Sequence, residues 1–226
     1  EWMASIREIS EKLTDSLIHH AARQLPPEVY ALSGPLIAEK MISRRNLIAR
    51  KGMEYYSFLS RKVNVLGSNQ KEYFRVSNTP EGLQVRVYAR ARGNDTSFIM
   101  YDRVFDPGVT KEIRLYGLND DDLFDIQESA DSRIKIRIIG GRGNDTFDIR
   151  GQVENLLYDL VDDANFIRNQ RHTKNRFSND PPLNESSLLD FNYNTLRYPQ
   201  LVTGYNTDDG FLVGAGVSMR TYGFRN

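Results

Sequence analysis

The chain has 226 residues, in which 30 Lys and Arg balance 30 Asp and Glu, so its net charge gives no reason to expect nucleic acid as a partner. It contains no cysteine, which excludes disulfides and zinc–thiolate sites. It has no apolar run of about 18 residues, so no transmembrane helix is expected. The length allows one large or two small domains with a real core.

Charge is segregated along the chain despite this balance. Residues 36–76 hold 9 basic and 3 acidic side chains, whereas residues 117–167 hold 5 basic and 12 acidic ones. The simpler interpretation is that the basic and acidic parts dock on each other. In the alternative, the basic segment meets an acidic surface of another molecule.

Residues 1–70 are predicted to form a helical subdomain. Thr14 is a helix cap in front of an apolar stripe with helical spacing, and Pro26 should end that helix. A second helix is expected to begin around Pro35, since proline is tolerated in a first turn. A third is expected over residues 44–63, with its basic side chains on a solvated face.

The apolar pattern becomes alternating from residue 72 onward, which indicates β-structure. Residues 72–90 predict a hairpin around a turn at 78–82, and residues 97–105 predict a further strand. The loop at 91–97 contains the letters RGNDT, which recur later in the chain. No Phe-Asp-Ile follows them here, so we interpret this loop as turn chemistry only.

One short pattern occurs three times within the expected β subdomain at 71–167. Each copy has an apolar run, a Gly/Asn/Asp turn and a short strand with one phenylalanine, and the copies span residues 113–126, 136–149 and 155–167. A strand and sharp turn repeating about every 20 residues are typical of a solenoid rung. The phenylalanines of the three copies should therefore form one internal column: Phe124, Phe147 and Phe166.

These patterns predict an α+β fold. A helical subdomain should precede a β-rich subdomain with short stacked, β-helix-like repeats. Glycine in the repeat turns supplies backbone conformations with positive φ, and Asn and Asp bond their own backbone.

The turn at 140–148, GGRGNDTFD, matches the calcium-binding nonapeptide of β-roll proteins. Calcium takes six to eight hard oxygens, and such a turn offers backbone carbonyls and a carboxylate. The other two copies lack some or all of these glycines, which favours structural Asx turns over calcium. The candidate calcium ligands are Asp120, Asp121, Asp122, Asn144, Asp145, Asp162 and Asp163, and no other cofactor is required.

The C-terminal part divides into an expected linker at 168–200 and a strand pattern at 201–226. Apolar side chains alternate with small and polar ones from Phe211 onward, as in a strand of an outer-membrane barrel or a half-buried strand of a soluble sheet. A single barrel strand is unstable alone, so residues 211–224 should be disordered or paired with an edge strand. We expect the chain to be a piece of a longer protein.

Several segments resemble a known family of Gram-negative outer-membrane proteins. The quoted segments are LTDSLIHHAARQLPPEVY at 13–30, KEIRLYGLNDDDLFDI at 111–126, IRIIGGRGNDTFDIRG at 136–151 and GYNTDDGFLVGAGVSMRTYGFR at 204–225. They are similar to the region before, and the first strand of, the C-terminal barrel in proteins that join a calcineurin-like metallophosphoesterase domain to a bacterial surface antigen (BamA-like) β-barrel. The resemblance covers nearly the whole chain, and its most specific part is GYNTDDG at 204–210.

The resemblance implies a connector at the periplasmic face of the outer membrane. Its partners would be the other parts of its own parent chain, with contact to the membrane only through the missing barrel. No phosphoesterase residue carries over, because the chain has neither Asp-x-His nor Gly-Asn-His-Asp/Glu. We therefore name no catalytic residue and expect this chain not to be an enzyme. The alternative is an accessory part of a metal-dependent phosphoesterase whose catalytic residues lie elsewhere.

Overall fold

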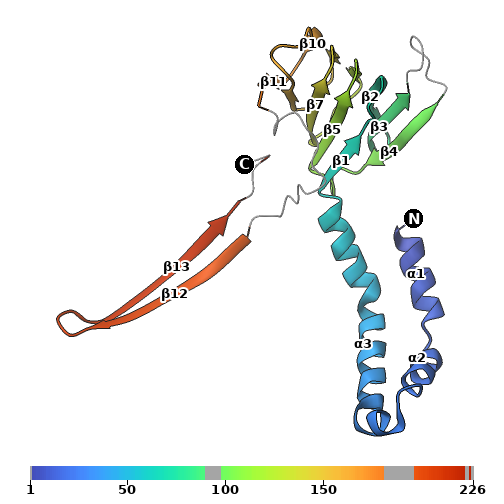
Figure 1. Ribbon diagram of the computed structural model, residues 1–226, viewed down its shortest axis with the longest axis vertical. Helices are drawn as coiled ribbons and strands as arrows, with labels where there is room; N and C mark the ends of the chain where they lie inside the picture. The colour runs from blue at the N-terminus through green and yellow to red at the C-terminus, as the bar shows by residue number, and fades with distance from the viewer. Residues whose placement is uncertain (1, 90–97, 181–195, 222–223, 225–226) are drawn as a thin grey trace.

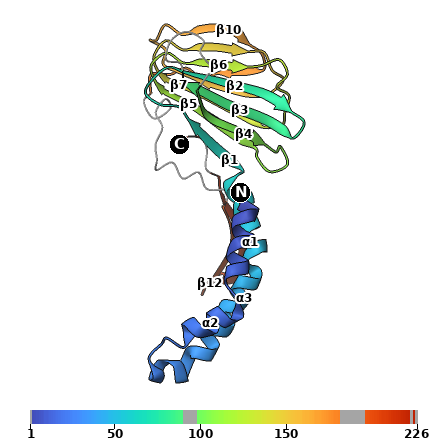
Figure 2. The same ribbon diagram turned by 90° about the vertical axis from the view of Figure 1, so that its right-hand side faces the viewer.

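The computed structural model describes residues 2–89, 98–180, 196–221 and 224, and the predicted loop at 91–97 lies outside them. Three helices are followed by strands only, so the fold is α+β as predicted (Figure 1). The helices and sheets occupy separate parts of the molecule. The helices extend away from the sheets, as a view at right angles also shows (Figure 2).

The N-terminal part consists of α1 (Trp2–Lys12), α2 (Asp15–Ala22) and α3 (Pro27–Leu59). Thr14 caps α2, because its Oγ1 accepts a hydrogen bond of 3.2 Å from the backbone N–H of Leu17. Helices α1 and α2 both pack against α3 and turn back on it. A small core between α2 and α3 holds them together, formed by Ile18, Ala22 and Ala38.

The prediction of a helix start near Pro35 is wrong, because α3 runs unbroken for 33 residues with Pro35 inside it. Proline removes one helical hydrogen bond and normally kinks or ends a helix. Here the neighbouring Gly34 and Ala38 are buried. The Tyr30 ring also lies so close that a Cβ on Gly34 would be 2.1 Å from it. We infer that this packing keeps the helix continuous across the proline.

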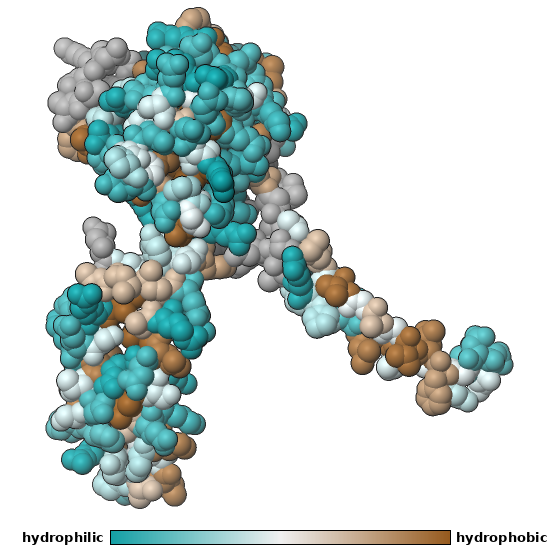
Figure 3. Space-filling model, turned by 180° about the vertical axis from the view of Figure 1, so that it is seen from behind, coloured by the Kyte–Doolittle hydropathy of each residue, from teal (hydrophilic) through white to brown (hydrophobic). Residues whose placement is uncertain are grey.

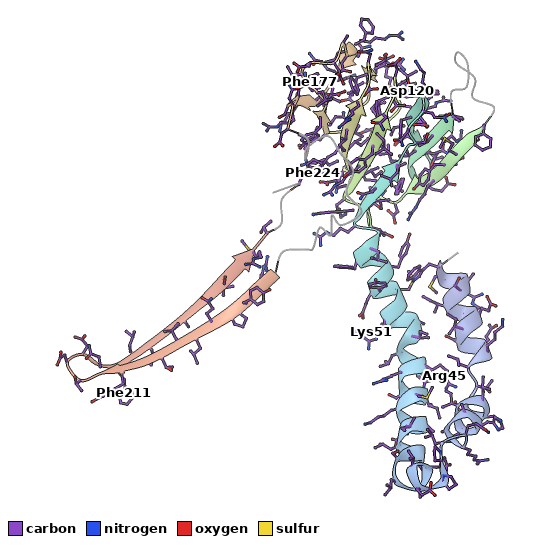
Figure 4. The ribbon with its side chains drawn as sticks, viewed as in Figure 1. Arg45, Lys51, Asp120, Phe177, Phe211 and Phe224 are labelled. Carbon is purple, nitrogen blue, oxygen red and sulfur yellow. The ribbon has the colours of Figure 1, made fainter. Side chains whose placement is uncertain are left out.

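The predicted docking between the basic and acidic segments is seen in part: Lys71 of the basic segment pairs with Asp120 and Asp121, whereas the basic side chains of α3 lie elsewhere. Figure 4 shows Asp120 at the far end of the sheets, whereas Arg45 and Lys51 lie on the helices. The basic side chains of α3 pair within the helical part instead: Arg45 with Asp15, and Lys51 with Glu54. The basic side chains of α3 and the acidic turns therefore lie at distant ends of the molecule.

Two sheets form the β part. One is fully parallel and has the order β1-β5-β7-β9-β11: Lys62–Leu66, Glu112–Asn119, Lys135–Arg142, Asn155–Tyr158 and Thr173–Asn175. The other has the order β10-β8-β6-β2-β3-β4: Phe166–Gln170, Thr146–Ile149, Leu123–Ile126, Glu72–Thr79, Gly82–Ala89 and Ile99–Phe105. Consecutive strands of the repeats alternate between the two sheets. The predicted hairpin is confirmed as β2 and β3, and the further strand is confirmed as β4.

Matching residues of the repeats pair side by side, and their side chains form one core. In the parallel sheet Leu115 pairs with Ile138, and both are buried. In the other sheet Phe124 pairs with Phe147, with their rings stacked 5.4 Å apart between centroids, and Phe74 stacks on Phe124 at 4.6 Å. These three rings are fully buried.

Phe166 does not belong to this column, contrary to the prediction. It is 57% exposed and pairs with Thr146, while Ile167 is the partner of Phe147 and packs against the core. The turn before it is longer than the corresponding turns of the first two copies. Aligning the copies on phenylalanine therefore placed the third one out of phase by one residue, and such a shift turns a side chain to the other face.

The column begins with Phe74, from a repeat unit that the sequence reading missed. Strands β1 and β2 pair in parallel with β5 and β6, as β5 and β6 do with β7 and β8. The spacing from glycine to phenylalanine carried this signal, since it is the same in Gly67 to Phe74 as in Gly117 to Phe124.

The predicted linker at 168–200 needs correction. It contains most of β10, all of β11 and the start of β12, while residues 181–195 lie outside the described part of the chain. The expected C-terminal strand is one half of a hairpin, β12 (Leu196–Asn206) paired with β13 (Gly210–Arg220). This hairpin extends away from both other parts of the molecule (Figure 1).

Candidate functional site: the acidic turns

The turn of each repeat unit combines a glycine with a carboxylate. Gly67 follows β1, and Gly117 and Gly140 lie near the ends of β5 and β7. In each unit an acidic residue lies five positions later, just before or at the start of the next strand: Glu72, Asp122 and Asp145. Because the units are stacked in register, the glycines form one column and the acidic residues form another. All three acidic side chains are buried.

The acidic side chains connect one unit to the next. The carboxylate of Asp122 accepts a 2.7 Å hydrogen bond from the backbone N–H of Glu72, and that of Asp145 accepts one of 2.7 Å from the N–H of Asp122. Asn165 continues the column and accepts from the N–H of Asp145 at 2.8 Å. Each of these bonds satisfies a backbone N–H group at a turn, where the hydrogen-bond ladder between the parallel strands provides no acceptor.

The glycine column provides the space for the second carboxylate oxygen. A Cβ on Gly117 would lie 2.2 Å from Oδ2 of Asp122, and one on Gly140 would lie 2.3 Å from Oδ2 of Asp145. No larger residue fits there unless a carboxyl group moves. In the described structure these two buried Oδ2 atoms have no hydrogen-bond partner.

The last unit exchanges the two roles. The place of the glycine is taken by Asp159, and the place of the acid is taken by Asn165. Oδ2 of Asp159 is buried and points back over Gly140, at 2.2 Å from a Cβ placed there, so it faces Oδ2 of Asp145. Two such oxygens attract each other only if one of the carboxyl groups carries a proton.

Burial sets the acidity of these groups. The pKa of Asp122 is raised to about 9, mainly because burial disfavours its charged form. The neighbouring charges of Asp145 and Glu72 raise it further, whereas the hydrogen bond from Glu72 lowers it. Burial likewise raises the pKa of Asp145 and Asp159, and the Asp145 charge adds to the rise at Asp159. Burial therefore favours the neutral, protonated form of Asp122, Asp145 and Asp159.

The turns of the first two sequence copies share positive φ values at matching positions that different residues occupy. Gly141 and Gly143 have φ values of 109° and 147°, and the matching Leu118 and Asp120 have 82° and 73°. A Cβ on Gly141 would lie 2.2 Å from the Leu118 carbonyl oxygen. The glycines of the second copy are therefore required by close packing, and the first copy adopts strained conformations in their absence.

The seven candidate calcium ligands fall into two groups in the structure. Asp122 and Asp145 lie in the buried column, and the other five lie toward the surface of the turns. Every one of these five accepts a hydrogen bond from the protein: Asp120 from Asp121 N, Asp121 from Asn144 N, Asn144 from Ala164 N, Asp162 from Asn179 and Asp163 from Gly143 N. Lys71 also pairs with Asp121 and Asp120.

This arrangement fits calcium poorly. Within the described ranges, no three His, Cys, Asp or Glu side chains converge as metal ligands would. Among the described acidic turns, the buried carboxyl oxygens without a partner are the Oδ2 atoms of Asp122, Asp145 and Asp159, whereas calcium needs six to eight oxygens. Most of the candidate carboxylates instead accept hydrogen bonds from the backbone of a neighbouring unit, and among them only Asp120 accepts from its own turn, so the prediction of Asx turns is not confirmed.

Two residues of the buried column were missed in the sequence. Glu72 was assigned to the hairpin, although it follows Gly67 by five residues, as Asp122 follows Gly117. Asp159 was assigned to a turn that lacks the glycines, although it follows Gly140 by 19 residues, which is the offset between the second and third copies. Glu72 bonds the Ser68 N–H at 3.0 Å and its hydroxyl, so it closes the column at its first end.

No helix in the described residues is both long and apolar enough to cross a membrane. Comparison with known proteins found no matching family model, no matching curated protein and no matching solved structure.

Proposed function

We propose that this chain is a non-enzymatic connector at the periplasmic face of the outer membrane. In this proposal it positions an upstream, phosphoesterase-like domain next to an outer-membrane β-barrel, and the β12–β13 hairpin is the start of that barrel. Its partners are the other parts of its own parent chain. The observation that carries the proposal is the two-faced character of this hairpin.

One face of the hairpin is almost entirely apolar. Residues paired directly across an antiparallel ladder share a face, and the faces alternate along the strand. The apolar face contains the pairs Arg197–Met219, Pro199–Val217, Leu201–Ala215, Thr203–Val213 and Tyr205–Phe211, with Arg197 as its only charged residue. The other face contains Tyr198–Ser218, Gln200–Gly216, Val202–Gly214 and Gly204–Leu212. Its residues are mostly small or polar.

Exposure and length support a lipid environment for the apolar face. Phe211 is 86% exposed, Leu201 is 74% and Val213 is 72%, so this face finds no cover in the described chain. Each strand has 11 residues, and a strand that crosses a bilayer needs about 9–11. A polar lumen on one face and lipid on the other is the pattern of an outer-membrane strand.

Phe224, which follows β13 in the sequence, contacts the β part. The Phe224 ring lies 4.8 Å from the Tyr158 ring, and the guanidinium groups of Arg137 and Arg114 lie 4.6 and 4.9 Å from its centre. Both arginines also bond the Glu112 carboxylate, which orients them. Such cation–π contacts fasten one end of the hairpin to the parallel sheet.

Single cysteines test this assignment, because the natural chain has none. Val217→Cys and Ser218→Cys place an environment-sensitive fluorophore on opposite faces at neighbouring positions of β13. On addition of phospholipid bicelles we expect a large blue shift of emission at position 217 and a much smaller one at 218. Equal shifts at both positions would contradict the proposal.

The second candidate is an accessory part of a metal-dependent phosphoesterase, which the Asp-rich turns favour. Hydrolysis of p-nitrophenyl phosphate esters is measured with added divalent metals, because turnover by this chain would contradict a non-enzymatic connector. We expect no turnover above the metal blank. Turnover that Asp145→Asn abolishes would favour the phosphoesterase.

A further inference from the structure

A cavity opens in the helical part where its first layer is interrupted. Helix α1 ends at Lys12 and α2 begins at Asp15, whereas α3 passes this point without a break. The interruption leaves a cavity of about 510 Å³ between the two layers. It is lined by Leu13, Ile18, Met41, Arg44, Arg45, Leu47, Ile48 and Lys51.

The floor of this cavity is apolar. Ile18 is only 2% exposed and belongs to the core between α2 and α3, while Met41 and Leu47 are each 42% exposed. Figure 3 shows hydrophobic side chains gathered along the helical part. Apolar surface left in water this way favours an apolar ligand, since its burial contributes about 25 cal/mol per Å².

The charged residues that line the cavity are all cationic. Arg45 bonds the Leu13 carbonyl and the Asp15 carboxylate, and Lys51 bonds Glu54, so both are held in place by neighbouring acceptors. Arg44 has no ion pair among the described residues. The cavity therefore combines an apolar floor with an unneutralised guanidinium, and an arginine fork matches carboxylate and phosphate groups.

We propose that this cavity binds one acyl-chain amphiphile with an anionic headgroup, the chain on the apolar floor and the headgroup at Arg44. A volume of this size is that of a small-ligand site, whereas a groove for a partner helix needs a row of anchor pockets along several turns. The absence of acidic residues in the lining excludes a cationic headgroup. The proposal is independent of the connector function.

Isothermal titration of the 226-residue chain tests it with probes kept below their micelle concentrations. Dodecyl phosphate and dodecanoate should bind saturably with a stoichiometry of one. Dodecylphosphocholine, which has the same chain length and no net charge, should bind about tenfold more weakly, and inorganic phosphate should show no saturable binding. Equal affinity for charged and zwitterionic probes, or no saturable binding of either anionic probe, would overturn the proposal.

Variants separate the two parts of the site. Arg44→Gln should weaken dodecyl phosphate about tenfold and leave dodecylphosphocholine unchanged. Lys40→Gln removes an equal charge from α3 outside the cavity lining and should change neither. Met41→Asp should weaken both probes. Equal losses of dodecyl phosphate affinity in Lys40→Gln and Arg44→Gln would show nonspecific electrostatic attraction. A dimer that Met41→Asp dissociates would show that a second copy of the chain covers the cavity. Either result would overturn the proposal.

Discussion

The β part and the helical part of this molecule differ in how completely they bury their apolar side chains. The β part encloses them between two sheets, so that Phe147 and Ile136 are fully buried. The helical part has a core of three buried residues and leaves Leu32 87% and Leu36 50% exposed. Because burial of apolar surface is the main stabilising contribution, the β part should be stable by itself and the helical part should be the weaker unit.

The largest effect is expected at the centre of the β core. Phe147→Ala should lower the free energy of unfolding by about 3–5 kcal/mol, because the ring is fully buried in a stacked column. Denaturant melts followed by circular dichroism measure this loss. Phe166→Ala is the matched control, with an expected loss below about 1 kcal/mol, since this ring is 57% exposed. Equal losses would contradict the observed register.

Truncating a side chain in the helical core should destabilise the helical part without affecting the β part. Ile18→Ala removes the largest of the three buried side chains there, and truncations of this kind cost about 2–5 kcal/mol. We expect faster amide hydrogen exchange throughout α2 and α3, with unchanged exchange in β5 and β7. Loss of protection in both parts at once would show that they unfold as one unit.

Stability should fall as pH rises, because of the buried carboxyl column. The pKa of Asp122 is raised to about 9, so the folded protein holds a proton that the unfolded chain releases above about pH 4. The stability that this proton contributes is complete below the unfolded pKa and is lost as pH rises through the folded one. Between pH 6 and 8 the expected loss from Asp122 is on the order of 1 kcal/mol per pH unit.

Asp122→Asn tests the origin of this pH dependence. The amide keeps an oxygen for the Glu72 N–H and never ionises, so this variant should be less sensitive to pH and more stable than the natural chain above pH 8. An unchanged slope would locate the titrating group elsewhere.

The glycine column should resist even one added methyl group. Gly140→Ala should cost about 1–3 kcal/mol, since the new Cβ would be 2.2–2.3 Å from two carboxyl oxygens. Gly216→Ala has no atom within 4 Å of the added carbon and should be nearly neutral. Thermal melts of both variants provide the comparison, and a neutral Gly140→Ala would mean that the carboxyl groups move easily.

Calcium should have the smallest effect. The turn oxygens already accept hydrogen bonds from the protein, so melting temperatures in EDTA and in millimolar calcium should agree. A rise of several degrees that Asp145→Ala abolishes would instead show a calcium site by linkage.

Local patterns predicted much of the fold and less of the site. The α+β class, the Thr14 cap and the β2–β3 hairpin depend on neighbouring residues, which a sequence displays directly. The continuity of α3 through Pro35, the burial of Asp159 and the outward Phe166 depend on contacts between distant segments. The sequence therefore shows Asp145 and Asp159 only as members of acidic turns. Their proximity follows from the pairing of β7 with β9, which places Asp159 against Gly140.

The two ends of each repeat unit differ in how freely their length can change. The turns that carry the carboxyl column are equally long in the first two copies, at 120–122 and 143–145, because each must place its acid against a glycine. On the opposite side, the connections at 127–134 and 150–154 differ in length without disturbing the pairing of the strands. Insertions in the course of evolution should therefore accumulate on that opposite side, and it is where a peptide tag or an additional loop can be grafted without unstacking the units.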